Sequence, residues 1–260
     1  MPFADVNGQH LYFEDSGGEG PAVIFSHGFL MDHEMFEPQV EALRDEFRCV
    51  TWDERGFGQT PASAPFTYWD SAEDCLALLN HLGIDGAVLA GMSQGGFLSL
   101  RAALRAPHRV KGLVLMDTQA GVEAQEARPL YQAMHDQWVS QGPSDELAGA
   151  VASLIMSPGY DPASWIAKWK AAPKEGMTLP FNCLMDREDI TDRLGEIGAP
   201  AIIFHGEADA SIPMESAEQL QAGLPTCVGL VRIPGAGHAA NLSHPDEVNG
   251  PLREFLRTHA

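Results

Sequence analysis

A chain of 260 residues is long enough for one α/β domain that carries an insertion and buries a sizeable core. Its 45% hydrophobic and 20% charged residues are ordinary for a folded protein, but its formal net charge of −20 is not. This charge argues against nucleic acid or an anionic membrane surface as a partner, because both would repel the protein.

The start of the chain, residues 1–8, contains neither a basic segment nor a long apolar one, and no later run reaches membrane-spanning length. The four cysteines are scattered and form no C-x-x-C pair. We therefore expect reduced thiols and a cytoplasmic protein. No zinc signature, P-loop or G-x-G-x-x-G is found, so neither a metal nor another cofactor is expected. The sequence leaves both a monomer and a homodimer open.

The first half of the chain alternates strand and helix patterns. Apolar and polar residues alternate on both sides of Asn7-Gly8, which predicts a hairpin. Strands alternating with helices predict crossover units and a mostly parallel sheet, to which the hairpin adds antiparallel strands at one edge. Buried-type strands are expected at 21–28, 49–53, 87–90 and 112–117, with helical spacing at 35–43, 69–82 and 97–104.

The alternation stops after Thr118 and resumes at Ala199. The residues between them show only helical patterns broken by prolines. We predict a core domain of residues 1–118 and 199–260, and a helical cap of residues 119–198 over the ends of the strands. After the cap, the patterns predict strands at 199–206 and 228–233 and helices at 214–224 and from about 244.

The predicted cap holds three of the five tryptophans, Trp138, Trp165 and Trp169. These rings are our candidates for lining an apolar substrate pocket. The alternative is that they only pack the cap against the core.

Residues Gly91-Met92-Ser93-Gln94-Gly95 match G-x-S-x-G at a strand-to-helix corner. A serine at such a corner projects its hydroxyl from the sheet, in a tight backbone that accepts only small neighbours. The backbone N–H groups at the start of the helix face any negative charge that forms beside the serine. Ser93 is therefore the candidate nucleophile.

A serine hydroxyl needs a base to take its proton, and the base needs a third group to orient it. His238 lies in a glycine-rich loop after the last strand, at the sheet edge where Ser93 emerges, and is the candidate base. His27 is expected to be structural within a His-Gly turn, and His205 to be a core histidine.

Three carboxylates compete for the role of the acid that orients the histidine. Asp209 follows the strand at 199–206 and is preferred. Asp117, at the end of the preceding strand, is the rival, and Glu207 is the third candidate.

The order Ser93, Asp209, His238 resembles that of the α/β-hydrolase family. The motifs His27-Gly28-Phe29, Asp53 to Gly58 and Gly235 to His238 agree with it, and the resemblance extends from about residue 3 to residue 258. It is weakest in the cap. In detail the chain resembles small serine esterases, enol-lactonases and cofactor-free perhydrolases.

The resemblance implies an eight-stranded, mostly parallel sheet flanked by helices. It also implies Ser93 as nucleophile, His238 as base and then acid, and Asp209 as the residue that orients it. An oxyanion hole is implied from the backbone N–H groups of Phe29 and Gln94. A serine at the corner disfavours the dehalogenase and epoxide-hydrolase branches, which need an aspartate there.

We therefore expect a serine hydrolase of carboxylic esters or lactones that works through an acyl-enzyme. The alternatives are a C–C bond hydrolase of vinylogous diketones and a small-molecule receptor on the same fold. Small, largely neutral apolar substrates are expected, because the cap is aromatic and its arginines are dispersed among acidic residues. These arginines are Arg128, Arg187 and Arg193.

Overall fold

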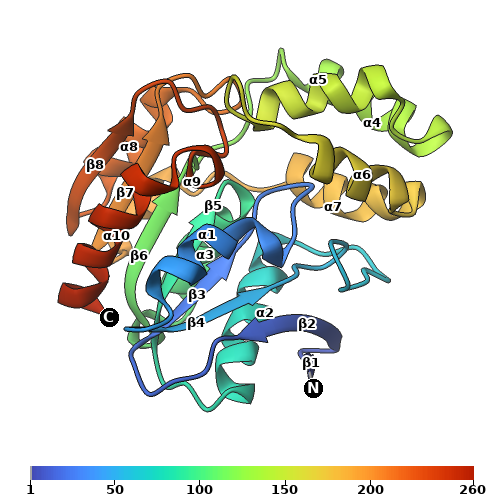
Figure 1. Cartoon of the computed structure of the whole chain (residues 1–260). Coiled ribbons are helices and arrows are strands. Elements are labelled where there is room, and N and C mark those ends of the chain that lie inside the picture. Colours follow the sequence, from blue (N-terminus) through green and yellow to red (C-terminus); the bar gives the residue numbers. More distant parts are fainter. Residues whose placement is uncertain (1) are drawn as a thin grey trace.

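A computed structural model describes residues 2–260 and contains an eight-stranded sheet (Figure 1). The strands lie in the order β1-β2-β4-β3-β5-β6-β7-β8. Strands β1, β2 and β4 pair antiparallel, and every pair from β4 to β8 is parallel. The predicted fold class is confirmed. The strands are β1 Phe3–Val6, β2 Gln9–Asp15, β3 Ala22–Ser26, β4 Arg48–Trp52, β5 Ala87–Met92, β6 Val110–Met116, β7 Ala201–Gly206 and β8 Cys227–Ile233.

Side chains of the parallel strands alternate between two buried layers, as the period of two along a strand requires. In β3, Val23 and Phe25 belong to one apolar cluster and Ile24, between them, belongs to the other. The cluster of Val23 also includes residues of α1 Glu37–Leu43, α9 Ala240–Ser243 and α10 Pro245–His259. The cluster of Ile24 includes residues of α2 Tyr68–His81, α3 Gln94–Arg105 and α8 Met214–Gly223.

Four α-helices lie between β6 and β7, in the segment predicted as a cap. They gather together at one end of the sheet (Figure 1). The division into a core of 1–118 and 199–260 and a cap of 119–198 stays a prediction. Among residues 2–260, no helix combines the length and the apolar character needed to cross a membrane. The four helices are α4 Arg128–Gln141, α5 Asp145–Ile155, α6 Ala163–Ala171 and α7 Thr178–Met185.

Candidate active site

Ser93 occupies a strained corner between β5 and α3. Its φ of +50° lies in a region that costs a residue with a side chain about 1–3 kcal/mol. The glycines on both sides are required by contact: a Cβ at Gly91 would lie 2.2 Å from the backbone of Gly95, and one at Gly95 would lie 2.0 Å from the carbonyl oxygen of Ser26. The G-x-S-x-G spacing thus permits the corner to form.

Two hydrogen bonds fix the backbone of Ser93 against the neighbouring strand. Its N–H donates to the carbonyl of Met116 at 2.9 Å, and the hydroxyl of Thr118 donates to the carbonyl of Ser93 at 2.7 Å. Ser93 is 7% exposed and lines a cavity. β6 and the residues that follow it therefore hold the backbone of Ser93 in its strained conformation. The side chain borders a cavity that a ligand can enter.

His238, in the loop between β8 and α9, lines the same cavity. Its Nδ1 donates to Oδ2 of Asp209 at 2.8 Å, which leaves Nε2 as the acceptor nitrogen of the neutral ring. The other oxygen of Asp209 accepts from the N–H groups of Ser211 at 2.7 Å and Ile212 at 3.0 Å. Burial opposes ionisation of Asp209, but the charge and hydrogen bond of His238, together with these N–H groups, hold its pKa below the ordinary value.

Asp117 ends β6 beside Asp209 but lies in different surroundings. It is fully buried, and its oxygens accept from the N–H groups of Gly206 at 2.7 Å and Ala240 at 3.4 Å. Burial, followed by repulsion from the charge of Asp209, raises the pKa of Asp117 well above the ordinary value. Of the three candidate acids, only Asp209 has a hydrogen bond to His238 within residues 2–260, and Glu207 is exposed.

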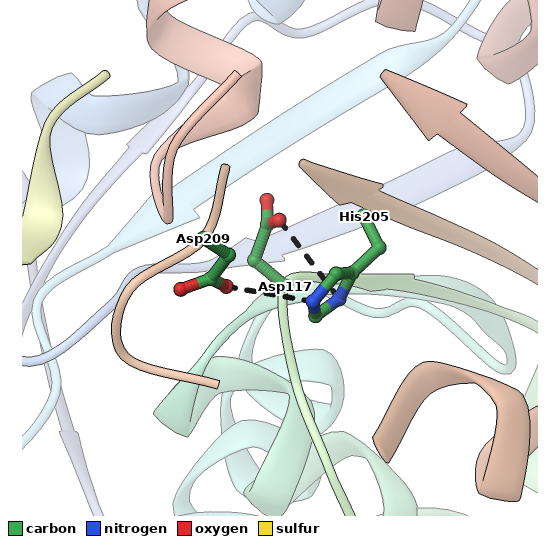
Figure 2. Close-up of side chains that lie close together, drawn as sticks. All are labelled: Asp117, His205 and Asp209. Atoms are coloured by element: carbon green, nitrogen blue, oxygen red, sulfur yellow. Dashed lines mark ion pairs between the residues drawn. The ribbon is translucent and has the colours of Figure 1, made fainter. Parts of the chain in front are cut away.

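Asp117, His205 and Asp209 form a compact buried group whose potential ligand atoms lie within 4.8 Å of one another. Figure 2 shows both carboxylates facing the ring of His205, at 4.0 Å from Nδ1 for Asp117 and 3.6 Å from Nε2 for Asp209. Nε2 lies 3.0 Å from the carbonyl of Ile212 and donates to it. Burial lowers the pKa of His205, which is fully buried and lies in the core as expected. These hydrogen bonds already occupy most of the atoms that a metal would need.

His27 supports the loop that contains Phe29. The N–H of Glu54 donates to Nε2 of His27 at 3.0 Å, so Nδ1 carries the proton and donates to the carbonyl of Gly28 at 2.8 Å. Burial lowers the pKa of His27 and favours this neutral ring. Within residues 2–260, no hydrogen bond is found for the backbone N–H of Phe29 or of Gln94, the first residue of α3. Both groups are therefore free to bind an oxygen.

The cavity beside Ser93 has a volume of about 150 Å³ and a mostly apolar lining. The core contributes Ser93, His238 and the loop after β3, whereas helices α4, α5 and α7 contribute mainly methionine, phenylalanine, leucine, valine and isoleucine side chains. Trp138 is part of this lining.

Trp165 and Trp169 lie elsewhere, and the expectation that they line the pocket needs correction. Both are on α6 and are buried, at 5% and 3% exposed, and neither is part of the cavity lining. The indole N–H of Trp169 donates instead to the carbonyl of Leu30 at 2.7 Å. Its ring also packs against that of Trp138 on α4, with 6.3 Å between ring centres, so the aromatic surface of Trp169 is buried between Leu30 and α4.

Four polar residues of the lining were not predicted from the sequence: Glu123, Tyr131, His135 and Ser211. His135 has a side chain 9% exposed, and its Nε2 is buried with no partner within residues 2–260. The helical spacing of Tyr131, Met134, His135 and Trp138 places them on one face of α4, and this pattern could have identified them.

Glu123 is paired with an arginine that lies behind the cavity wall. Nη1 of Arg187 donates to Oε2 of Glu123 at 2.5 Å, and the guanidinium lies 4.4 Å from the ring centre of Phe97. Arg187 itself does not line the cavity. Glu123 therefore borders the cavity with its carboxylate paired to Arg187, and Arg187 itself lies outside the lining.

Comparisons with known proteins show the family and the fold of the chain. A sequence model of the α/β-hydrolase fold matches residues 21–245. A relative from Agrobacterium fabrum, named as a carbamate hydrolase, is 29% identical, and the match covers 95% of this chain and 98% of that protein.

Two solved structures have the same fold over nearly their whole length. A thermophilic esterase from Thermogutta terrifontis is 31% identical, with a TM-score of 0.87 and coverage of 97% of this chain and 95% of that one. An enol-lactonase from Burkholderia xenovorans is 26% identical, with a TM-score of 0.90 and coverage of 98% and 100%.

Proposed function

The chain belongs to the α/β-hydrolase family, and on this premise we propose that it is a serine hydrolase of carboxylic esters or lactones, working through an acyl-enzyme. One observation carries the proposal: His238, which is hydrogen-bonded to Asp209, borders the same cavity as the strained Ser93. The esterase and the enol-lactonase among the similar structures support the reaction class.

In the first half of the reaction, Ser93 Oγ attacks the carbonyl carbon of the substrate while its proton passes to Nε2 of His238. Asp209 stabilises the imidazolium that forms, because its pKa is held low and it stays ionised. The carbonyl oxygen becomes an oxyanion, which the N–H groups of Phe29 and Gln94 bind. His238 then returns the proton to the leaving alkoxide, the C–O bond breaks, and the acyl group remains on Ser93.

Water completes the cycle by the same steps. It loses a proton to His238 and attacks the acyl carbon, and the second oxyanion occupies the same pair of N–H groups. His238 then donates its proton to Ser93 Oγ as the acyl bond breaks, which regenerates the serine and releases the acid. In a lactone the leaving alkoxide belongs to the same molecule as the acid.

A small, largely neutral substrate with an apolar part fits the cavity best. Burying apolar surface against the lining gains roughly 25 cal/mol per Å² before association costs are subtracted. An apolar cavity of about 150 Å³ holds a benzene-sized group, which favours short acyl chains. A substrate carboxylate would also meet the carboxylate of Glu123 on the lining, with Arg187 out of direct reach.

The proposal includes a cytoplasmic location and a small-molecule substrate as the partner. All four cysteines are free, and Cys49, Cys75 and Cys183 are buried. Burial raises the pKa of Cys49 to about 12, so this thiol is protonated and inert at neutral pH. Such thiols fit a reducing compartment.

The test is replacement of Ser93 by alanine, with Ser216→Ala as the control, because Ser216 does not line the cavity. We expect Ser93→Ala to fold normally and to lose turnover by at least about 10³-fold, with no loss in the control. A serine-directed phosphonate should label Ser93 alone. Retention of more than about a tenth of the activity would rule out the serine mechanism.

The substrate panel should contain simple esters, lactones and ring-cleavage diketones. Steady multiple turnover on esters or lactones is expected. Binding without turnover would favour a receptor, and turnover of the diketones alone would favour C–C bond hydrolysis.

A further inference from the structure

We propose that helix α6 positions the oxyanion-binding loop through Trp169 and Lys168. We use this name for residues 28–34, which run from just after β3 into the first residues of the short helix η1 His33–Phe36. The inference rests on the proposed function, because it concerns the N–H of Phe29 as an oxyanion donor. Trp169 and Lys168 are positioning residues and do not touch the substrate.

Two adjacent residues of α6 hold the loop at three points. The indole N–H of Trp169 donates to the carbonyl of Leu30 at 2.7 Å. Nζ of Lys168 lies 2.7 Å from Oδ2 of Asp32 and 2.7 Å from Oε2 of Glu34. Trp169 is 3% exposed, and an indole N–H can only donate, so its bond to Leu30 is fixed in direction.

The bond from Trp169 reaches Phe29 through two peptide groups. The peptide between Leu30 and Met31 accepts from Trp169 at its carbonyl, and its N–H donates to the carbonyl of Gly28 at 3.1 Å. That carbonyl belongs to the peptide group whose N–H is the N–H of Phe29. The series of hydrogen bonds therefore fixes the plane of the peptide group between Gly28 and Phe29, whose N–H is the oxyanion donor. Each bond also polarises the next.

The loop needs this support because its backbone is strained at Leu30. Leu30 has a φ of +65°, which a residue with a side chain adopts only where its surroundings hold it. Without the bond to Trp169, Leu30 can relax to a negative φ, which turns the peptide groups beside it. On the core side His27 already holds the carbonyl of Gly28 at 2.8 Å, so the peptide of Phe29 is clamped from both sides.

Trp165 provides a matched control on the same helix. It is as deeply buried as Trp169, at 5% exposed, but no hydrogen bond from its indole N–H is found within residues 2–260. Trp165→Phe and Trp169→Phe therefore remove similar amounts of packed surface, and only the second removes a bond to the loop. Phenylalanine at 165 keeps an aromatic ring beside Nζ of Lys168, which lies 4.6 Å from the ring centre of Trp165, and phenylalanine at 169 keeps a ring beside Trp138, whose ring centre lies 6.3 Å from that of Trp169. With an aromatic ring kept at both positions, a loss of kcat specific to Trp169→Phe reports the bond to Leu30.

The experiment measures kcat and KM of both variants on one neutral ester. We expect Trp169→Phe to lower kcat about tenfold with KM changed less than about twofold, because the oxyanion exists only after attack. We expect Trp165→Phe to change neither value more than about twofold. The affinity for a boronic acid that adds to Ser93 should fall with kcat/KM in Trp169→Phe and not in Trp165→Phe.

Equal effects of the two variants, or an effect of Trp169→Phe on KM alone, would overturn the inference. If the wild-type protein shows no Ser93-dependent turnover, the proposed function fails and this inference falls with it. If the wild-type protein shows Ser93-dependent turnover but the variants do not behave as expected, only the inference about Trp169 and Lys168 fails, and the proposed function stands.

If Trp169→Phe does not fold, Lys168 decides the matter. Lys168→Met should lower kcat several-fold at constant KM, and Lys168→Arg should restore it by keeping the ion pairs with Asp32 and Glu34. Unchanged kcat in Lys168→Met would then count against the proposal.

Discussion

The two sides of the cavity are built in different ways. On the core side, Ser93 and Asp209 are held by hydrogen bonds to named partners, and Ser93 adopts a strained backbone that these bonds maintain. On the cap side, the lining from α4, α5 and α7 is mostly apolar and packs by contact. Its few polar groups include His135 on α4 and Glu123 in the segment before α4. Under the proposed function the difference separates two tasks: the core side fixes the reacting atoms, and the cap side selects what reaches them.

The same contrast predicts how substitutions on each side act. A change on the core side alters charge or geometry at the reacting carbonyl, so it acts on the transition state. A change on the cap side alters the fit of one substrate relative to another. Core-side variants should therefore lose activity on every substrate, and cap-side variants should change selectivity.

After substitution of Ser93 itself, Asp209→Asn should give the largest loss of kcat. The amide removes the negative charge that stabilises the imidazolium of His238, and it no longer holds the ring in one tautomer. In the protease template this change costs about 10⁴-fold in kcat. Steady-state kinetics on two unrelated neutral esters should show the same loss for both. A loss confined to one ester would contradict the division between the two sides.

Glu123→Gln should change the selectivity between neutral and carboxylate-bearing esters about tenfold. We expect the wild-type protein to prefer a neutral ester over its carboxylate-bearing analogue, because Glu123 is an acidic residue of the cavity lining. Glutamine keeps the size, removes the repulsion and leaves the charge of Arg187 unpaired, so the preference should narrow about tenfold, or about 1.4 kcal/mol.

The measurement is kcat/KM for the matched pair of esters at two ionic strengths. Glu126→Gln is the control, because Glu126 is exposed and lies outside the lining. A wild-type preference of tenfold or more for the charged ester would defeat the assignment of neutral substrates.

Asp117→Asn should change kcat no more than a few-fold, although Asp117 ends the strand next to β7. Asp117 has no bond to His238, and its raised pKa means that a neutral carboxyl suits its site. A group whose pKa is raised on folding contributes stability at low pH that is lost as pH rises from about 3.8 through the folded-state pKa. The variant lacks this group, so its free energy of unfolding should fall less with rising pH.

Urea unfolding of the wild-type protein and of Asp117→Asn at pH 5 and pH 8 would measure how the free energy of unfolding of each changes with pH. An identical change in the two proteins would mean that Asp117 titrates normally. A loss of kcat as large as that of Asp209→Asn would move the acid to β6.

The fold was predictable because its signals are local. The apolar run before Ser93 and the helical spacing after it are patterns of neighbouring residues, and the close contact of Gly91 with Gly95 is equally local. The parallel order of the strands then follows from the crossover rule. The expected bounds differ from those of the structure by a few residues, as at β6, which begins at Val110.

The wall of the cavity was harder to predict because it depends on which face of each helix packs inward. The aromatic content of the cap predicted three tryptophans in the lining, but only Trp138 lies there. Trp169 instead contacts Leu30, 139 residues earlier in the chain, and no local pattern reveals such a partner. The pairing of Arg187 with Glu123 depends on the same long-range packing.

Removal of metal ions by chelation comes last in this order, because we expect it to leave the activity unchanged. The group Asp117, His205 and Asp209 brings atoms of metal-binding type together, so it is the place where a metal would act if one were needed. Asp209 uses Oδ2 to orient His238 and Oδ1 to accept two backbone N–H groups, while Nε2 of His205 donates to a carbonyl. A metal would have to displace these bonds in a buried site, and it would take from His238 the partner that the proposed mechanism requires.

The measurement is activity on a neutral ester after prolonged dialysis against EDTA, with and without added zinc. We expect equal rates after dialysis, and inhibition if zinc reaches this group. Activity lost on dialysis and restored by a divalent ion would show that the core side works through a metal, and the assignment of Asp209 to His238 would have to be replaced.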